Sequence, residues 1–518
     1  MGVINSDILV NNADMNFLYN RAIQMQSCLK DGNFTFFYYN DFNGAGYGTS
    51  FFYGGITLYP FLIVINYGKR AFLLAYIVVT LILMQLGILT LYKRFSENYK
   101  NIAILPMMSV VFLTCLTKTG SYANYLTLAL SLFFLAFAVD FFRDRKSFIP
   151  VSLLYLILIS SHLVTALLCF IFTVLLLVLY FDKSRLKDYA YFLIVTVLLC
   201  SYTIINMLYH SDILNRQLII SSKFKDAFSN KDYSVILYFA DTYPFKGILY
   251  NIIFSDYSHN GFSYINTALL LFCLILCRIR KLSVREFIVF ILSIVFIILS
   301  VHKVWFTISI YLTGWIQYPL RYAPYIIIVF ILISFRYCSK KRVYVLAVAL
   351  CAIDLLVFPS IGSVDEGYSN YITYEDQIMN GEYLDSSFLF DNYIFEDLSS
   401  SLRDNHGFSY DYTINKDKLY VNIDNYNNDL VLRFPKLYYK GYVLESTTSD
   451  ESFDCIKGYS QFIEADIGDY SGELVLYYKH PDFLVLVYAL CIAFTVVLIM
   501  IYVSVLFNEC QNNKICKK

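Results

Sequence analysis

Near its N-terminus the chain carries polar residues whose types and spacing suit acid–base and anion chemistry. Asp14 and Arg21 are seven residues apart, so on a helix they would share a face, two turns apart. Asp41 follows, at the start of a glycine- and aromatic-rich stretch, residues 40–55, that includes Tyr53. A carboxylate can act as a general base, and a guanidinium can bind phosphate through paired hydrogen bonds. The alternative is a loop that caps a helical bundle and packs its aromatic side chains on a membrane surface.

Further candidates lie at two other places along the chain. Gln317 and Arg321 flank a Tyr-Pro-Leu stretch, and His302 and Lys303 lie at the other end of the same short segment. Cations at this position suit a lipid-linked phosphate, although Arg also serves as an interfacial anchor. His162 follows two serines in a predicted turn, where an imidazole can bind phosphate or move a proton. It can equally be a turn residue that is hydrogen-bonded to the backbone.

The composition indicates which scaffold must position these residues. Of the 518 residues, 58% are hydrophobic and only 15% are charged, and Lys plus Arg balance Asp plus Glu at 40 each. A soluble globular chain is roughly 25% charged. The apolar residues fall in long blocks, so we predict an α-helical polytopic membrane protein. Soluble, disordered, collagen-like and disulfide-scaffold classes are excluded, and no basic face is available for nucleic acid.

About eleven apolar stretches could cross a bilayer, which requires roughly 20 residues or somewhat fewer with snorkelling flanks. They are 71–91, 102–117, 122–142, 149–161, 163–181, 189–208, 263–277, 286–300, 322–335, 343–359 and 483–507. The stretch 149–181 is long for one helix, and we divide it at Ser160, Ser161 and His162.

The distribution of Lys and Arg supports that division. Six short segments together hold 20 Lys and Arg against four acids, namely 92–101, 143–148, 182–187, 278–285, 336–342 and 508–518. With eleven spans all six fall on one side, which the positive-inside rule makes cytoplasmic. The large segments then lie on the external side of the membrane, and so does the N-terminus. We therefore expect that a first signal-anchor helix is missing, which would bring the total to twelve.

The predicted organisation has five parts. Residues 1–70 form a first external loop, and residues 71–359 form the helical bundle, with external loops 209–262 and 301–321. An acidic external β-domain covers 360–482, with strands expected near 418–423, 429–434 and 473–478, and we expect a β-sandwich. A C-terminal anchor, 483–507, and a cytoplasmic tail, 508–518, complete the chain.

Taken in order, these motifs resemble bacterial YfhO-type membrane proteins and the related family labelled "6-pyruvoyl-tetrahydropterin synthase-related", both of the GT-C superfamily of integral-membrane glycosyltransferases. The resemblance covers essentially the whole chain. The matching residues are Asp14, Arg21, Lys30-Asp31-Gly32, Asn43-Gly44-Ala45-Gly46-Tyr47-Gly48, Phe51-Phe52-Tyr53, Tyr59-Pro60, Ser161-His162-Leu163-Val164-Thr165, Gln317-Tyr318-Pro319-Leu320-Arg321, Phe434-Pro435-Lys436-Leu437-Tyr438-Tyr439-Lys440-Gly441-Tyr442 and Gly472 to Pro481.

The resemblance implies a GT-C-like fold and a polyprenyl-phosphate-linked sugar as donor. It makes Asp14 the general base for an inverting attack by an acceptor hydroxyl, with Asp41 in reserve. Arg321 would bind the departing phosphate. The acceptor would be a teichoic acid, another wall polymer or a glycolipid. Some superfamily members use a divalent metal, but no ligand cluster in this sequence demands one.

The remaining donor and substrate contacts expected from the resemblance and the sequence are His162, Lys303, His302, Arg21, Gln317 and Tyr53. Two other functions remain open at this point. A transporter or flippase would also need many spans, although the chain shows no inverted repeat and few charges within its spans. A degenerate, non-catalytic envelope scaffold would use only the acidic domain for binding.

Overall fold

The computed structural model describes residues 13–32, 44–46, 48–52, 54–95, 122–144, 147–211, 284, 400–424 and 429–515. Five of the predicted spans lie outside these residues, namely 102–117, 263–277, 286–300, 322–335 and 343–359. Every structural statement below concerns the described part of the chain.

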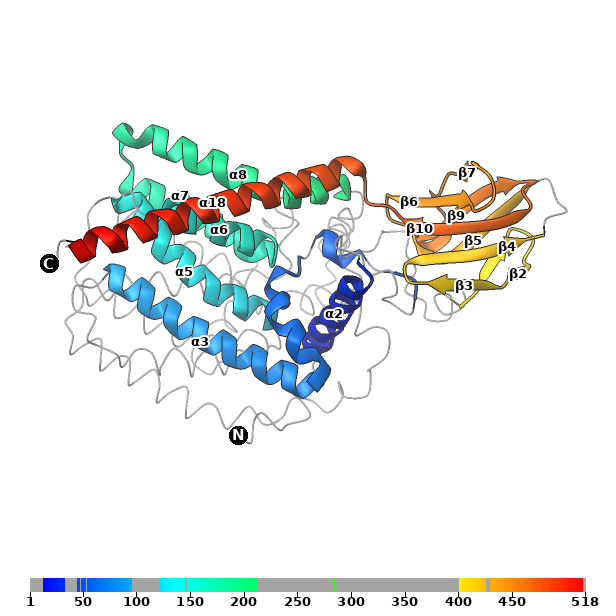
Figure 1. The fold of residues 1–518 in the computed structure, drawn as a ribbon, viewed down its shortest axis with the longest axis horizontal. Coiled ribbons are helices and arrows are strands. Elements are labelled where there is room, and N and C mark those ends of the chain that lie inside the picture. The colour runs from blue at the N-terminus through cyan, green and yellow to red at the C-terminus, as the bar shows by residue number, and fades with distance from the viewer. Residues whose placement is uncertain are drawn as a thin grey trace, which may run out of the picture.

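A bundle of α-helices makes up one part of the molecule (Figure 1). Its helices are α2 (Ala13–Lys30), α3 (Lys69–Phe95), α5 (Tyr122–Asp144), α6 (Phe148–Ile159), α7 (Leu163–Tyr180), α8 (Leu186–Tyr209) and α18 (Asp482–Ile515). Short 3-10 helices are η1 (Thr49–Phe51), η2 (Ile56–Tyr67), η3 (Lys183–Arg185) and η10 (Tyr459–Gln461). Among the described residues, five helices are long and apolar enough to cross a membrane: those starting at Lys69, Leu126, Leu163, Lys183 and Asp482.

The long apolar stretch 149–181 is two helices, as the sequence predicts. Helix α6 ends where the Ser161 hydroxyl donates to the Ile157 carbonyl at 2.6 Å. Helix α7 then begins with His162 as its N-cap, since His162 Nδ1 accepts the backbone N–H of Thr165 at 3.2 Å. Side-chain caps of this kind satisfy N–H groups that the first turn of a helix leaves without partners.

One end of the bundle gathers basic residues and is called the basic end below. There Arg94 of α3 forms an ion pair with Asp140 of α5, with Nη2 2.9 Å from Oδ2. Arg185, which precedes α8, donates to the carbonyls of Phe141 and Phe142 at the end of α5. Helices α3 and α5 therefore run in the same direction, and the described parts of the predicted cytoplasmic segments 92–101, 143–148 and 182–187 lie together.

A β-sandwich lies at the opposite end of the bundle, beyond the start of α18 (Figure 1). One sheet has the order β2-β1-β5-β9-β8 and the other the order β3-β4-β10-β6-β7, and all pairs are antiparallel. The strands are β1 (Leu402–Asp404), β2 (Ser409–Tyr410), β3 (Tyr412–Asn415), β4 (Lys418–Ile423), β5 (Leu430–Leu437), β6 (Tyr442–Ser446), β7 (Ser452–Phe453), β8 (Ile456–Lys457), β9 (Phe462–Gly468) and β10 (Gly472–Tyr478).

The two sheets share one core. Leu432 and Ala465 from the first sheet are buried in the same cluster as Val421 and Leu474 from the second. Along β4 buried residues alternate with more exposed ones, because successive side chains of a strand point to opposite faces. The expected β-rich domain is thus present over residues 402–478.

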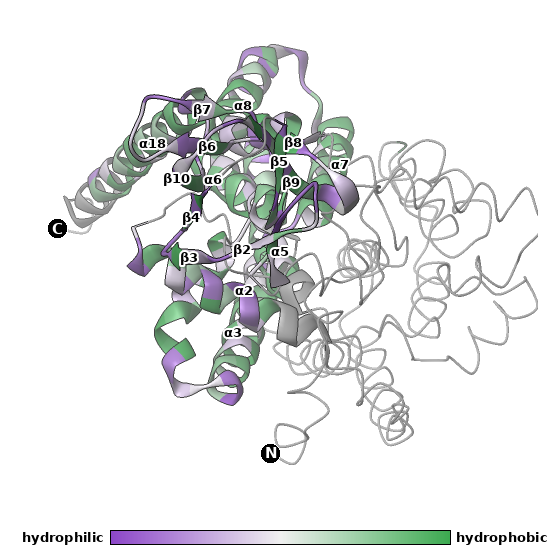
Figure 2. Cartoon of the chain, turned by 90° about the vertical axis from the view of Figure 1, so that its right-hand side faces the viewer, coloured by the Kyte–Doolittle hydropathy of each residue, from purple (hydrophilic) through white to green (hydrophobic). Residues whose placement is uncertain are grey.

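Within residues 1–70, predicted as a first external loop, the structure describes helix α2 and the 3-10 helices η1 and η2. Helix α2 and the 3-10 helix η2 pack on each other and on α3, and Gln26 Nε2 donates to the Leu62 carbonyl at 3.1 Å. Hydrophobic residues cover the helices, and polar residues gather at loops and helix ends (Figure 2). Only 17% of the most apolar stretch of the final helix, α18, is buried inside the protein. Its exposed apolar surface therefore suits the hydrocarbon core of a bilayer.

Candidate functional site

A glycine- and aromatic-rich segment joins the bundle to the sandwich. We call its described residues, 44–46, 48–52 and 54–55, the strap. The Leu437 backbone N–H donates to the Ala45 carbonyl at 2.8 Å, and the Lys436 ammonium donates to the Gly44 carbonyl at 2.6 Å. Strand β5 therefore holds the start of the strap by two hydrogen bonds. The sandwich is attached to the first segment and not only to the helix that follows it.

Two glycines of the strap are needed for close approach. A Cβ at Gly48 would overlap the ring of Tyr439, and a Cβ at Gly54 would overlap the backbone carbonyl of Ser160. Glycine permits such contacts because it has no side chain. The strap is thus pressed against the sandwich at one position and against the α6–α7 turn at the other.

Phe51 sits at the centre of this junction and is 2% exposed. Its ring stacks on His210, just beyond α8, and also contacts the rings of Tyr439 and Tyr478, each at 5.7 Å between ring centroids. Its carbonyl accepts from Asn206 Nδ2 at 3.2 Å. The strap, helix α8 and the sandwich therefore meet around one side chain.

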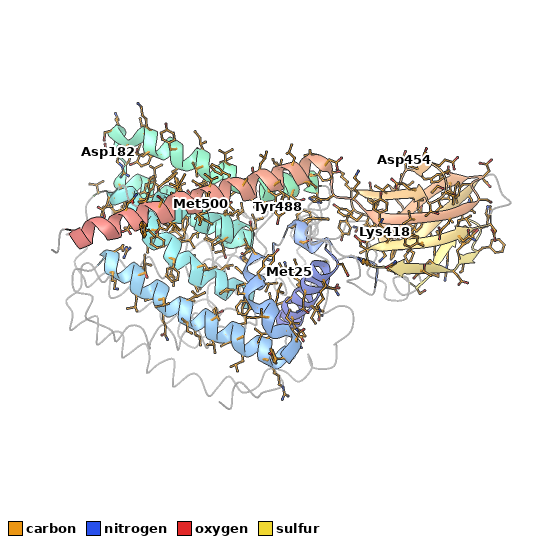
Figure 3. All side chains as sticks on the ribbon, viewed as in Figure 1. Met25, Asp182, Lys418, Asp454, Tyr488 and Met500 are labelled. Carbon is orange, nitrogen blue, oxygen red and sulfur yellow. The ribbon has the colours of Figure 1, made fainter. Side chains whose placement is uncertain are left out.

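A cavity of about 270 Å³ lies beneath the strap. Its walls come from α2, the strap, the end of α6, α8 and α18. Met25 of α2 and Tyr488 of α18 both contribute to the wall, and both are labelled in Figure 3. Most of the wall is apolar, and its polar side chains include Asn206 and Tyr202 of α8 and Ser50 of the strap.

Buried bases surround the junction between the cavity and the sandwich. Burial, assisted by His480 and Lys440, lowers the pKa of His210 to about 3. Burial also lowers the pKa of His480 to about 4 and that of Lys436 to about 7. Both histidines are therefore neutral at pH 7. The Tyr202 hydroxyl lies 3.4 Å from His480 Nε2, which links the cavity wall to this group.

The structure describes three of the residues predicted to do chemistry. Asp14 and Arg21 lie on α2, two turns apart on one face, as their spacing predicts. Arg21 is only 2% exposed, on the same inward side as Leu18 and Met25. His162 is also buried at 2%, and its Nδ1 caps α7 and lies 2.9 Å from the Thr165 hydroxyl.

For His162, the structure therefore shows the second of the two predicted roles, a turn residue that is hydrogen-bonded to the backbone. Its phosphate-binding role stays a prediction. The remaining predicted site residues lie outside the described residues: Asp41, Tyr53, His302, Lys303, Gln317 and Arg321. Convergence of Asp14 and Arg321 stays a prediction for the same reason.

Sequence reasoning did not single out the polar residues of the cavity and its junction, which are Ser50, Tyr202, Asn206, His210 and His480. A weak signal was present for two of them. Asn206 is an amide near the end of an apolar span, and His210 follows the same span directly. Polar groups at such depth usually face protein or a cavity.

Within the described residues, no group of three or more His, Cys, Asp or Glu side chains is arranged to hold a metal ion. No protein-family model, curated protein or solved structure matches this chain. The functional argument therefore rests on the geometry of the site and on the motifs in the sequence.

Proposed function

We propose that this chain is an integral-membrane glycosyltransferase of the GT-C type. It moves a sugar from a polyprenyl-phosphate-linked donor to an envelope acceptor, a teichoic acid, wall polymer or glycolipid, at the outer face of a bacterial plasma membrane. One observation carries the proposal. The strap is clamped between the sandwich and the bundle directly over a cavity whose α8 and α18 walls border the exposed apolar surface. Such a junction suits a reaction between a membrane lipid and a polar acceptor.

The first segment supplies the proposed base. Asp14 takes the proton of the acceptor hydroxyl while that oxygen bonds to the anomeric carbon. The bond from this carbon to the phosphate oxygen breaks, and the lipid phosphate leaves as an anion with inversion at the sugar. A hydroxyl is a poor nucleophile until a positioned base removes its proton. Helix α2, which carries Asp14, also contributes Met25 to the cavity wall, so the proposed base and one wall residue of the cavity belong to the same helix.

The departing phosphate needs fixed positive charge. Arg321 is the proposed group, with Gln317, His302 and Lys303 from the same predicted loop. Arg21 is a further cation of the first segment, and its position two turns from Asp14 on α2 supports a role in orienting that carboxylate or the donor. Strong burial of this guanidinium at 2% exposure is unusual for Arg and supports a specific role.

Removal of the base tests the proposal. The full-length Asp14→Asn variant, in membrane vesicles with a panel of polyprenyl-phosphate-linked sugars, should lose transfer by roughly 10²- to 10⁴-fold, the usual contribution of a positioned general base. Asp31→Asn is the matched control, because Asp31 is exposed in the turn directly after α2. Equal insertion of both variants into the membrane must accompany the comparison. Undiminished transfer by Asp14→Asn would remove Asp14 as the base.

A transporter or flippase for a lipid-linked or small substrate is the second candidate, and the cavity between α8 and α18 favours it because lipid could enter there. Substrate movement across proteoliposomes without sugar transfer would select this function. Binding of a wall polymer without either activity would instead select the non-catalytic scaffold.

A further inference from the structure

The described residues that line the cavity beneath the strap give it an uncharged wall. Among the described residues that line it, none is Asp, Glu, Lys, Arg or His. An anionic head group would lose its hydration there without gaining a cation from the described wall, and burial of an unpaired charge is strongly unfavourable. The electrostatics of this wall therefore disfavour a lipid phosphate and favour a neutral ligand.

Two polar atoms in the wall lack partners among the described residues. They are Asn206 Oδ1 and Ser50 Oγ, both buried from solvent and both on residues that line the cavity. Asn206 is 3% exposed, and its amide nitrogen already donates to the Phe51 carbonyl. A buried acceptor without a donor is unfavourable, because it has lost its hydrogen bonds to water. A ligand that offers a hydroxyl to Asn206 Oδ1 would remove this cost.

The cavity is placed to receive such a ligand from a lipid phase. Its wall on α18 includes Ile492 and Val496, which are 46% and 48% exposed on the outer surface of the helix. These side chains border both the cavity and the apolar outer face. The ligand's body is therefore expected to be a hydrocarbon chain, with the hydroxyl end directed toward α8 and the strap.

We propose that this cavity binds an uncharged glycerolipid with free hydroxyl groups, of the acylglycerol or glycosylglycerolipid type. The volume of about 270 Å³ accommodates a glycerol head group and the first part of an acyl chain, near the roughly 300 Å³ lower limit of small-molecule pockets. The binding claim stands on the cavity alone. The assignment of this lipid as the acceptor of the transferase, rather than the donor, rests on the proposed function.

The test measures binding of tritiated monooleoylglycerol to the purified full-length protein in maltoside micelles. Competition uses two ligands with the same chain, the dimethyl ether of monooleoylglycerol and oleoyl lysophosphatidic acid. We expect both to compete at least about tenfold more weakly, since the ether cannot donate a hydrogen bond and the phosphate is charged. Equal competition by the lysophosphatidic acid would overturn the proposal.

Variants locate the binding. Val496→Trp should fill the cavity and abolish binding, whereas Val497→Trp, at the neighbouring 45%-exposed position that is absent from the cavity wall, should leave it unchanged. Ser50→Ala should weaken binding of monooleoylglycerol by roughly three- to tenfold and weaken binding of the ether less, since the ether can accept from Ser50 but cannot donate to it. The same affinity in Val496→Trp and Val497→Trp would place the ligand elsewhere and overturn the proposal.

The lipid site and the glycosyltransferase function can be contradicted independently of each other. Asp14→Asn should bind monooleoylglycerol normally, because it changes the proposed base and not the cavity wall. Binding without any sugar transfer would contradict the transferase and leave the lipid site standing. Sugar transfer without monooleoylglycerol binding would contradict the lipid site and leave the transferase standing.

Discussion

The rings of Phe51 and His210 stack face to face, with centroids 3.8 Å apart and planes 6° from parallel. Phe51 belongs to the strap and His210 follows helix α8, so the stack joins segments far apart in the sequence. Both side chains are buried, at 2% and 1% exposure. A protonated imidazole in this apolar contact would be costly, and the stack therefore depends on a neutral His210.

Acid should loosen this junction. His210 has a pKa of about 3 in the folded state and about 6.5 when unfolded. As the pH falls below about 6.5, the unfolded chain gains a proton that the folded chain does not accept until about pH 3. The free energy of unfolding therefore falls across this window, by about 2 kcal/mol between pH 6.5 and 4.5 from His210 alone.

Thermal unfolding of detergent-solubilised protein at pH 7 and pH 4.5 measures the effect. The variant His210→Phe should lose less stability between these two pH values than the parent does. His480, whose pKa burial lowers to about 4, remains in the variant, so part of the acid sensitivity persists. His406→Phe is the control, since this side chain is 37% exposed on the sandwich. An unchanged pH dependence in His210→Phe would contradict the prediction.

Gly54→Ala should displace the strap. The added methyl group would overlap the Ser160 backbone carbonyl, which the α6–α7 turn holds in place. A Cβ at Gly458 would also overlap a neighbour, but there the neighbour is the Glu464 side chain, which can move by loosening its ion pair with the partly exposed Arg433, whereas the Ser160 carbonyl is backbone. We expect Gly54→Ala to lower stability by more than about 2 kcal/mol and Gly458→Ala to cost clearly less. Melting temperatures of the two variants test this order, and equal losses would contradict it.

The Arg94–Asp140 pair at the basic end should stabilise the bundle measurably. Both carboxylate oxygens of Asp140 accept from Arg94 Nε, at 2.9 and 3.1 Å, and the Asp140 side chain is only 12% exposed. The Arg143–Asp144 pair, with side chains 41% and 39% exposed, is the contrast. In a double-mutant cycle for each pair, Arg is replaced by Gln and Asp by Asn. The coupling free energy should be roughly 1–3 kcal/mol for the first pair and under about 1 kcal/mol for the second. Equal couplings would refute this difference.

Substitutions at His162 separate its capping role from a chemical one. Asn can cap the first turn of α7 in place of the imidazole, whereas Ala cannot. His162→Ala should therefore lower stability by about 1 kcal/mol, and His162→Asn should lower it less. If capping is the whole role, sugar transfer by His162→Asn should stay near that of the parent. A stable His162→Asn variant without transfer would point to phosphate binding or proton transfer.

Local patterns in the sequence predicted much of the described fold correctly. Strand β4 has the predicted bounds, 418–423, and helices α3, α7 and α8 differ from the predicted spans by a few residues at their ends. The break before α7 was visible because Ser160, Ser161 and His162 interrupt an apolar run. Periodicity and hydropathy act over a few residues, so these features are readable from neighbours along the chain.

The candidate site could be predicted only in part. Asp14 and Arg21 share a face of α2 because both lie on one helix, and a seven-residue spacing implies this directly. The 3-10 helix η2 was missed because Pro60 and its aromatic neighbours are typical of a turn. The cavity was missed because its walls come from segments far apart in the sequence, and the pattern of residues 40–55 does not indicate that α8 and α18 pack beside them.

The sequence alone predicted that apolar helices alternate with basic segments in the described part of the chain, that a β-rich domain precedes the last helix, and that Asp14 and Arg21 share one face of a helix. These properties depend on composition and local spacing. Only the tertiary structure decided that Lys436 donates to the carbonyl of Gly44, 392 positions away, and that Asn206 and Ser50 line a common cavity. Such contacts join segments that are separated by many more residues than a local sequence pattern covers. Their partners are determined by the shapes of the packed elements and by the need to give buried polar groups hydrogen bonds.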